Sequence, residues 1–339
     1  MMARWGTTIP RIRLVAALFA TAGNVSLSAA QETHLIVISG LGGDPAYSQR
    51  FVEWGNTFVE AAGELGIPEN RITFLGESLG RDSKVSARST RANVQKAFAQ
   101  MVNNAKTGDQ IFAILIGHGS YTAGESRFNL PGPDMTANDF SLLLDQLSDQ
   151  SVAFVNLTSA SGEFVGALSG PGRVIITATK TGMERNETSF GGYFLGAFAG
   201  NGADLNRDDR VSLFEAFEFA RSEVAREYET SNRILTEHAL LDDNGDGEGS
   251  SELEDGPDGV SARNMFLVPD ETTAAAIATD DPVLRGLYEE KGELERRIEE
   301  LRTLRGRIEE SRYERELEEL LVALALKNRE IQAHGGDGA

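Results

Sequence analysis

Two short apolar runs, each ending in small polar residues, constrain what this chain can fold into. The first run, residues 111–116, leads into His118, and the second, residues 152–157, leads into Ser159. Uninterrupted apolar runs of this length, bounded by Gly and Ser, are typical of buried parallel strands in an α/β sheet. Ligands of such sheets bind beyond the carboxyl ends of the strands. We therefore expect His118 and Ser159 to lie at neighbouring strand ends, where a base and a nucleophile would be placed.

Strand and helix signals alternate along most of the chain. Residues 34–38 and 72–75 are further apolar runs of strand length, and apolar residues recur at helical spacing between the runs. This alternation predicts a three-layer α/β/α sandwich with a mostly parallel sheet. Residues 127–133, with Pro131 and Pro133, are expected to form a loop, and residues 265–268 could add a strand.

The ends of the two runs resemble the caspase and legumain superfamily of cysteine peptidases, and legumain-type asparaginyl endopeptidases in particular. In that pattern an apolar run leads into His-Gly, and a later run leads into a turn of the form x-Cys-x-Ser-Gly. His118 falls on the catalytic histidine, Ser159 on the nucleophilic cysteine, and Ser161 and Gly162 on the Ser-Gly that follows. The resemblance covers roughly residues 33–198 and implies a caspase-like fold. It also implies a peptide-binding cleft beside Gly119, Ser161 and Gly162.

The chain departs from that family at the nucleophile, because it contains no cysteine. A thiol ionises readily beside a histidine, whereas a serine hydroxyl needs a well-oriented base. At the position where legumains have an Asn that orients the histidine, the best local match is Gly42, which has no side chain to donate or accept a hydrogen bond. Two interpretations stay open. Proteolysis is weak or lost, or His118 and Ser159 form a working serine dyad with backbone amides near Gly119 and Ser159 holding the oxyanion.

The first thirty residues have the pattern of a secretory signal peptide. Three arginines precede an apolar run at residues 14–20, and small residues at positions 28–30 suit cleavage. That run is too short to span a bilayer, so we expect no stable membrane insertion after cleavage and a periplasmic or secreted protein. The net charge of −20 disfavours nucleic acid as a partner.

Residues 204–215 resemble the calcium loop of an EF-hand. Oxygen ligands fall at the expected spacing, with the carbonyl of Arg210 at the seventh position, although Asp209 replaces the usual glycine at the sixth. The alternative is an acidic turn that caps the following helix. The side-chain ligands of the calcium interpretation are Asp204, Asn206, Asp208, Ser212 and Glu215.

The C-terminal segment has a different pattern. Apolar residues follow a heptad spacing in two stretches within residues 281–339, which predicts an antiparallel, coiled-coil-like helical hairpin. The expected domains are a signal peptide at 1–30, the α/β domain at 31–270, a linker at 271–280 and the hairpin at 281–339. The hairpin could pack on the α/β domain or bind a protein partner.

These patterns lead to three functional hypotheses. The first is an exported legumain-like homologue that binds a peptide or protein in a cleft with weak or lost proteolysis, in effect a pseudoenzyme. The second is an active serine-variant peptidase or hydrolase. The third is a calcium-stabilised periplasmic scaffold, which is compatible with the first.

Overall fold

A seven-stranded sheet forms the centre of the computed structural model, which describes residues 31–80, 84–200, 202–207, 210–253, 256–268, 281–303 and 309–335. Its strands are β1 (Thr33–Ser39), β2 (Ile72–Gly76), β3 (Ala87–Arg88), β4 (Gln110–Ile116), β8 (Ser151–Asn156), β9 (Arg173–Thr177) and β10 (Leu240–Asp242). They lie in the order β10-β9-β8-β4-β1-β2-β3. All neighbours are parallel except β10, which runs antiparallel to β9.

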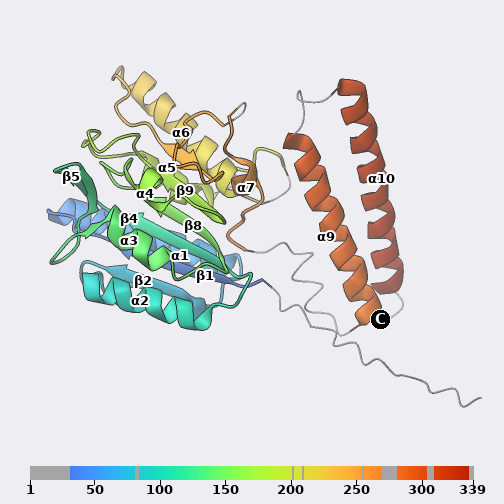
Figure 1. Cartoon of the computed structure of the whole chain (residues 1–339), viewed down its shortest axis with the longest axis horizontal. Coiled ribbons are helices and arrows are strands. Elements are labelled where there is room, and N and C mark those ends of the chain that lie inside the picture. Colours follow the sequence, from blue (N-terminus) through green and yellow to red (C-terminus); the bar gives the residue numbers. More distant parts are fainter. Residues whose placement is uncertain are drawn as a thin grey trace, which may run out of the picture.

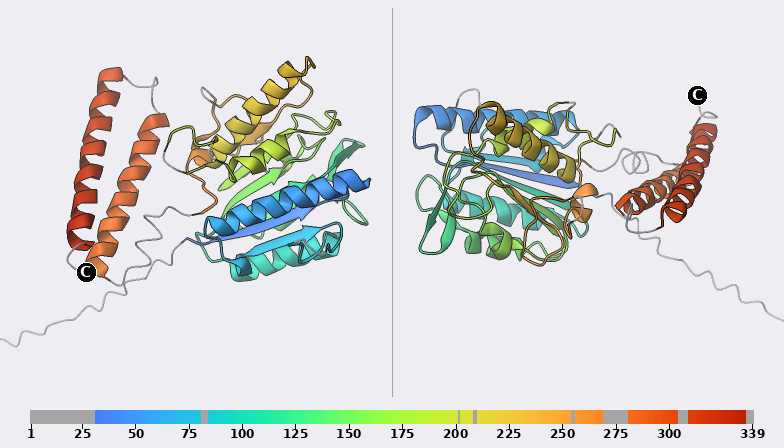
Figure 2. Two further views of the ribbon diagram at one scale, coloured as in Figure 1. Left: turned by 180° about the vertical axis from the view of Figure 1, so that it is seen from behind. Right: turned by 90° about the horizontal axis from the view of Figure 1, so that it is seen from above.

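Helices cover both faces of this sheet, as Figures 1 and 2 show. One face packs against α1 (Pro45–Glu64), α5 (Phe190–Ala197) and α6 (Leu213–Thr230). The other packs against α2 (Arg91–Asn104), α3 (Ala137–Leu144) and α4 (Phe164–Leu168). The predicted three-layer α/β/α sandwich with a mostly parallel sheet is therefore confirmed. Two short helical turns complete the domain, a 3₁₀ helix at Glu69–Arg71 and α7 (Val260–Arg263).

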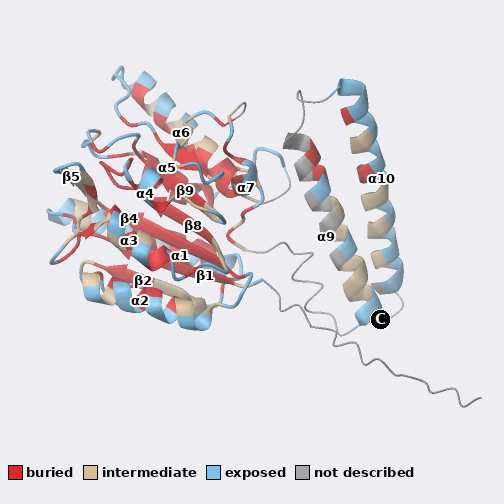
Figure 3. Cartoon of the chain, in the orientation of Figure 1, coloured by how far each residue is buried: buried red, intermediate tan, exposed pale blue. Residues whose placement is uncertain are grey.

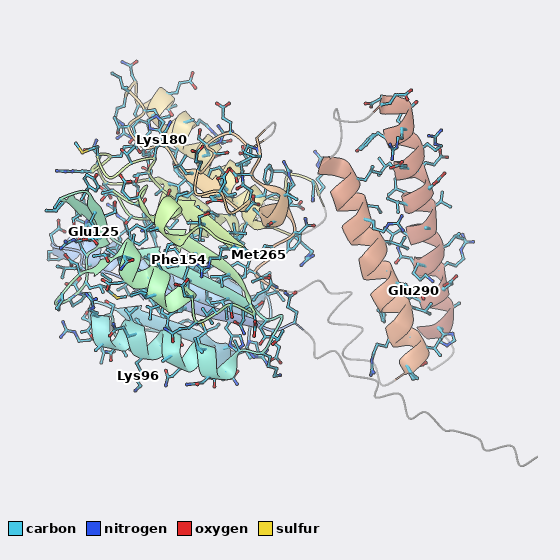
Figure 4. The ribbon with its side chains drawn as sticks, in the orientation of Figure 1. Lys96, Glu125, Phe154, Lys180, Met265 and Glu290 are labelled. Atoms are coloured by element: carbon cyan, nitrogen blue, oxygen red, sulfur yellow. The ribbon has the colours of Figure 1, made fainter. Side chains whose placement is uncertain are left out.

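The central strands are buried on both faces, which explains why their sequences are apolar without alternation. Every residue of β4 is buried, and so is every residue of β8 after its first (Figure 3). Phe154 of β8, labelled in Figure 4, packs its ring against Phe140 of α3 and Phe164 of α4. These layers hold the carboxyl ends of β4 and β8 firmly side by side.

A small antiparallel sheet lies beyond the end of β4. It consists of β5 (Gly119–Thr122), β6 (Glu125–Phe128) and β7 (Met135–Thr136). The predicted loop at residues 127–133 is wrong at its first two residues, which end β6. The polar side chains of β5 and β6 give no apolar run, so the pairing between them was not visible in the sequence.

Near the end of the α/β domain, residues 265–268 do not form a strand. Phe266 makes a single antiparallel bridge to Ser212. The suggested additional strand is therefore wrong, and the sheet is completed by β10 instead.

Two further helices, α9 (Pro282–Thr303) and α10 (Glu310–Gly335), pack against each other beside the α/β domain (Figures 1 and 2). Among the described residues, no helix is both long enough and apolar enough to cross a bilayer. The predicted signal peptide at 1–30 and the linker at 271–280 lie outside the described residues. The division into domains stays a prediction.

Candidate functional site

Ser159 and Gly119 come together where β4 and β8 end. The two strands are parallel neighbours, with Leu115 opposite Asn156, so the residues that follow them meet at one edge of the sheet. The backbone N–H of Gly119 donates to Ser159 Oγ at 3.4 Å, and this hydroxyl donates to the Gly119 carbonyl at 3.3 Å. The Ser159 hydroxyl is thus bound to backbone groups at the start of β5.

This close approach requires a glycine at position 119. A Cβ there would lie 2.1 Å from the carbonyl oxygen of Ser159, well inside van der Waals contact. Directly after Ser159, Ala160 has a φ of 53°, in the left-handed region that non-glycine residues rarely adopt. Its N–H donates to the carbonyl of Glu184 at 2.7 Å, which holds the strained residue in place. Backbone strain of this kind concentrates at functional sites.

His118 is held by aromatic rings from α1. Its imidazole packs edge-on against Tyr47 and Phe51, with ring centroids 4.7 and 5.0 Å away. The backbone of Gly42 also lies close enough to the imidazole to favour its protonated form. Burial among these groups lowers the pKa of His118, although the carboxylate of Glu187 partly opposes the shift. The imidazole is therefore neutral near pH 7, and it is a weaker base than an exposed histidine.

The rings of Tyr47 and Phe51 are thus the groups that position the His118 imidazole. Gly42 has no side chain that could orient the histidine, so only its main chain can influence the ring. Aromatic residues four apart on a helix share one face, so Tyr47 and Phe51 together were the only sequence signal for this packing.

His118 and Ser159 lie at adjoining strand ends, but no hydrogen bond joins their side chains in the part of the chain that the structure describes. A serine nucleophile needs a base within hydrogen-bond reach, although such contacts often tighten only when substrate binds. In this arrangement the hydroxyl is not activated.

Ser161 and Gly162 lie inside the turn and do not line an open cleft. The Ser161 hydroxyl is fully buried and meets Thr179 Oγ1 at 3.0 Å, and the Thr179 N–H donates to it at 3.2 Å. A Cβ on Gly162 would lie 2.2 Å from the Lys180 carbonyl oxygen. Through these contacts, the turn that contains Ser159 packs against the segment that follows β9.

The segment after β9 links His118 to a neighbouring pocket. Tyr47 Oη donates to a Glu187 carboxylate oxygen at 2.7 Å, and Arg50 pairs with the other oxygen of Glu187. Glu187 lines a polar pocket of about 510 Å³, in which Glu227 pairs with Arg233 at 2.7 Å. Two arginines and two glutamates thus face one recess. The remaining lining residues are Asn186, Ser189, Tyr228, Ile234 and Thr236.

A cluster with metal-ligand chemistry lies at the opposite edge of the sheet, at the amino ends of β1 and β4. It consists of Glu32, His34 and Asp109. Both Asp109 oxygens accept backbone N–H groups, and Glu32 is paired with Arg71 and Lys106. Two cations already balance this cluster, so it fits a structural ion-pair network that joins the strand ends.

The EF-hand-like segment is organised by Glu215. One of its oxygens accepts the N–H groups of Leu205 and Asn206, and the other accepts the N–H and hydroxyl of Ser212, the residue that caps α6. Asp204 accepts the N–H of Arg207 at 2.7 Å. The side chain of Arg210 stacks on Phe266 and donates to the carbonyl of Val268. Asp208 lies outside the described residues, and calcium binding here stays a prediction.

The calcium prediction has a direct thermal test. Excess chelator should lower the melting temperature of the wild type relative to excess calcium, because an ion that binds only the folded state stabilises it by mass action. Glu215→Gln should remove most of that difference. The Glu215→Gln variant should also melt at a lower temperature in both buffers, because the Glu215 carboxylate forms a capping box with Ser212 at the start of α6. Coincident wild-type melting curves in the two buffers would leave the segment as a helix cap alone.

Comparison with known proteins finds similarity to solved structures. No protein-family profile and no curated protein matches the sequence. Among solved structures, a structural-genomics protein from Geobacter sulfurreducens is 12% identical, with a TM-score of 0.41 over 62% of this chain and 92% of its own. The structure of drICE, a caspase, is 10% identical, with a TM-score of 0.36 over 59% of this chain and 85% of its own. Neither similarity assigns a ligand or a reaction to this chain.

Proposed function

We propose that this protein is a caspase-like, legumain-related peptidase homologue that binds a peptide or protein segment with weak or lost proteolysis. The observation that carries this proposal is the state of Ser159, whose hydroxyl bonds to both backbone groups of Gly119 and not to the imidazole of His118. The lowered pKa of His118 weakens the base as well. The pocket beside Glu187 offers a surface for binding, and within the described residues no contact between His118 and Ser159 activates the serine hydroxyl.

The alternative of a working serine dyad would need His118 to move within reach of Ser159 when substrate binds. Edge-on packing against two aromatic rings opposes such a movement. Export to the periplasm or outside the cell remains part of the proposal and rests on the sequence of residues 1–30.

Recognition in this proposal uses the pocket beside Glu187. Carboxylates and guanidinium groups together can accept and donate hydrogen bonds, so the pocket suits a polar side chain of the bound peptide. The guanidinium carbon of Arg233 lies 4.5 Å from the centroid of the Tyr228 ring. The same guanidinium group pairs with Glu227 at the pocket wall. It has no contact with His118 or Ser159 in the described structure, which makes it a probe of binding alone.

We expect Arg233→Glu to weaken peptide binding by about tenfold or more, because it places a third carboxylate in the pocket and removes a donor. The assay is retention of a random peptide library by the immobilised protein, quantified by mass spectrometry. Glu64→Arg, an exposed charge reversal at the end of α1, is the matched control and should bind like the wild type. Equal retention by wild type and Arg233→Glu would contradict recognition through this pocket.

A further inference from the structure

The helical hairpin has a small core of its own. Ile298 and Leu301 of α9 are buried against Tyr313 and Leu320 of α10, and three further leucines pack around them. Two helices bury little apolar surface by themselves, and most helical stability comes from packing of an amphipathic face. A hairpin of this size would be stabilised by another surface.

A second apolar strip runs along a different side of α10. Leu321, Val322 and Leu326 are 45%, 54% and 52% exposed, and Ala325 between them is exposed as well. Leu321 and Val322 lie one helical turn before Ala325 and Leu326, so the four side chains form one continuous strip on the surface of α10. In Figures 1 and 2, α9 stands between α10 and the α/β domain. Among the described residues the α/β domain therefore does not cover this strip. Contiguous exposed apolar surface of this kind marks interaction sites.

Opposite charges stand at the two ends of this strip. Glu318 lies before it and Arg329 after it, eleven residues or about three helical turns apart, which places them on the same side of α10. Both are exposed, and neither makes an ion pair within the described residues. An apolar strip with a negative end and a positive end is self-complementary when two copies run antiparallel.

We propose that α10 pairs with α10 of a second copy of this chain in an antiparallel, two-fold symmetric dimer. The symmetry places Leu321 against Leu326 of the partner subunit and Val322 against Ala325 of the partner subunit. Glu318 then meets Arg329 of the partner subunit, and the same pair recurs at the other end because a two-fold interface is isologous. The two hairpins form a four-helix arrangement, in which flanking charges set orientation and partner choice.

The distribution of charge along the chain favours a second hairpin, and not an α/β domain, as the partner of this strip. Residues 282–335 contain 11 basic and 13 acidic residues, whereas the whole chain has a net charge of −20. Two nearly neutral hairpins can meet without strong repulsion while the acidic α/β domains stay apart. The proposed interface lies outside the cleft and is independent of the proposed function.

Sedimentation equilibrium of the full chain tests this dimer. The wild type should dimerise, and Glu318→Arg or Arg329→Glu alone should each raise the dissociation constant by about tenfold or more, because two attractive pairs become repulsive. An equimolar mixture of the two variants should form heterodimers with near wild-type affinity, and so should the double variant Glu318→Arg/Arg329→Glu with itself. Glu64→Arg makes the same charge change on α1 and should leave the dissociation constant unchanged.

Circular dichroism establishes that each variant keeps its helix content, so a loss of dimer is not a loss of fold. A wild type that stays monomeric at about 0.1 mM would overturn the proposal. Single charge reversals that leave the dissociation constant unchanged would overturn it too. A mixture that fails to recover heterodimers would overturn the antiparallel pairing.

Discussion

Ser159→Cys should hydrolyse peptides at least about 10²-fold faster than the wild type, with His118 as the base. A thiol loses its proton far more easily than a serine hydroxyl, so it needs less help from a histidine of lowered pKa. Sulfur is also a weak hydrogen-bonding group, so the bonds that tie Ser159 Oγ to Gly119 would not hold it. The measurement is cleavage of a fluorogenic peptide pool at pH 7.

His118→Ala in the Ser159→Cys background is the matched control, and it should remove most of the gained activity. The lowered pKa of His118 leaves the imidazole neutral and able to accept a proton at pH 7, and activity should fall as the pH drops and the ring becomes protonated. A cysteine variant whose thiol reacts with iodoacetamide and yet cleaves nothing would show that His118 is not placed to serve the nucleophile.

Phe140→Ala should lower the free energy of unfolding by about 3–5 kcal/mol. Phe140 of α3 is fully buried, and its ring packs 5.3 Å from Phe154 and 6.0 Å from Phe164, between centroids. It also lies 6.4 Å from Phe128 of β6, the strand that pairs with β5 at Gly119. The cavity left by the ring would therefore loosen both the sheet and the support of the site.

Urea unfolding followed by circular dichroism measures this loss. Leu142→Ala is the control on the same helix, because Leu142 is 59% exposed and its truncation should change the free energy of unfolding by less than about 0.5 kcal/mol. A similar loss for both variants would contradict the view that burial of Phe140 in the aromatic core is what stabilises this part of the fold.

The central sheet could be predicted because its strands are buried on both faces. Continuous apolar runs identified β4 and β8, and the rule for parallel strands placed His118 and Ser159 at one edge. The edge strand β10 has only three residues, too few to give a run. The polar β5 was not predicted, and the last two residues of β6 were predicted as loop. Short strands depend on partners distant in sequence, which no local pattern reveals.

The surroundings of His118 show a second limit. The residues near it come from α1 and from the segment after β9, more than 60 positions away along the chain on either side. The helix α1 begins at Pro45, and Asp44 before a proline is a typical start signal.

Labelling with a serine-reactive phosphonate tests the central claim most directly. The protein is incubated with excess fluorophosphonate, and the adduct is measured by intact-mass spectrometry and located by peptide mapping. The proposal of a peptide-binding cleft without an activated nucleophile predicts no adduct on Ser159, and the same mass for the wild type and for Ser159→Ala apart from the substitution. A stoichiometric adduct on Ser159 that is lost in both Ser159→Ala and His118→Ala would contradict it and establish a working serine dyad.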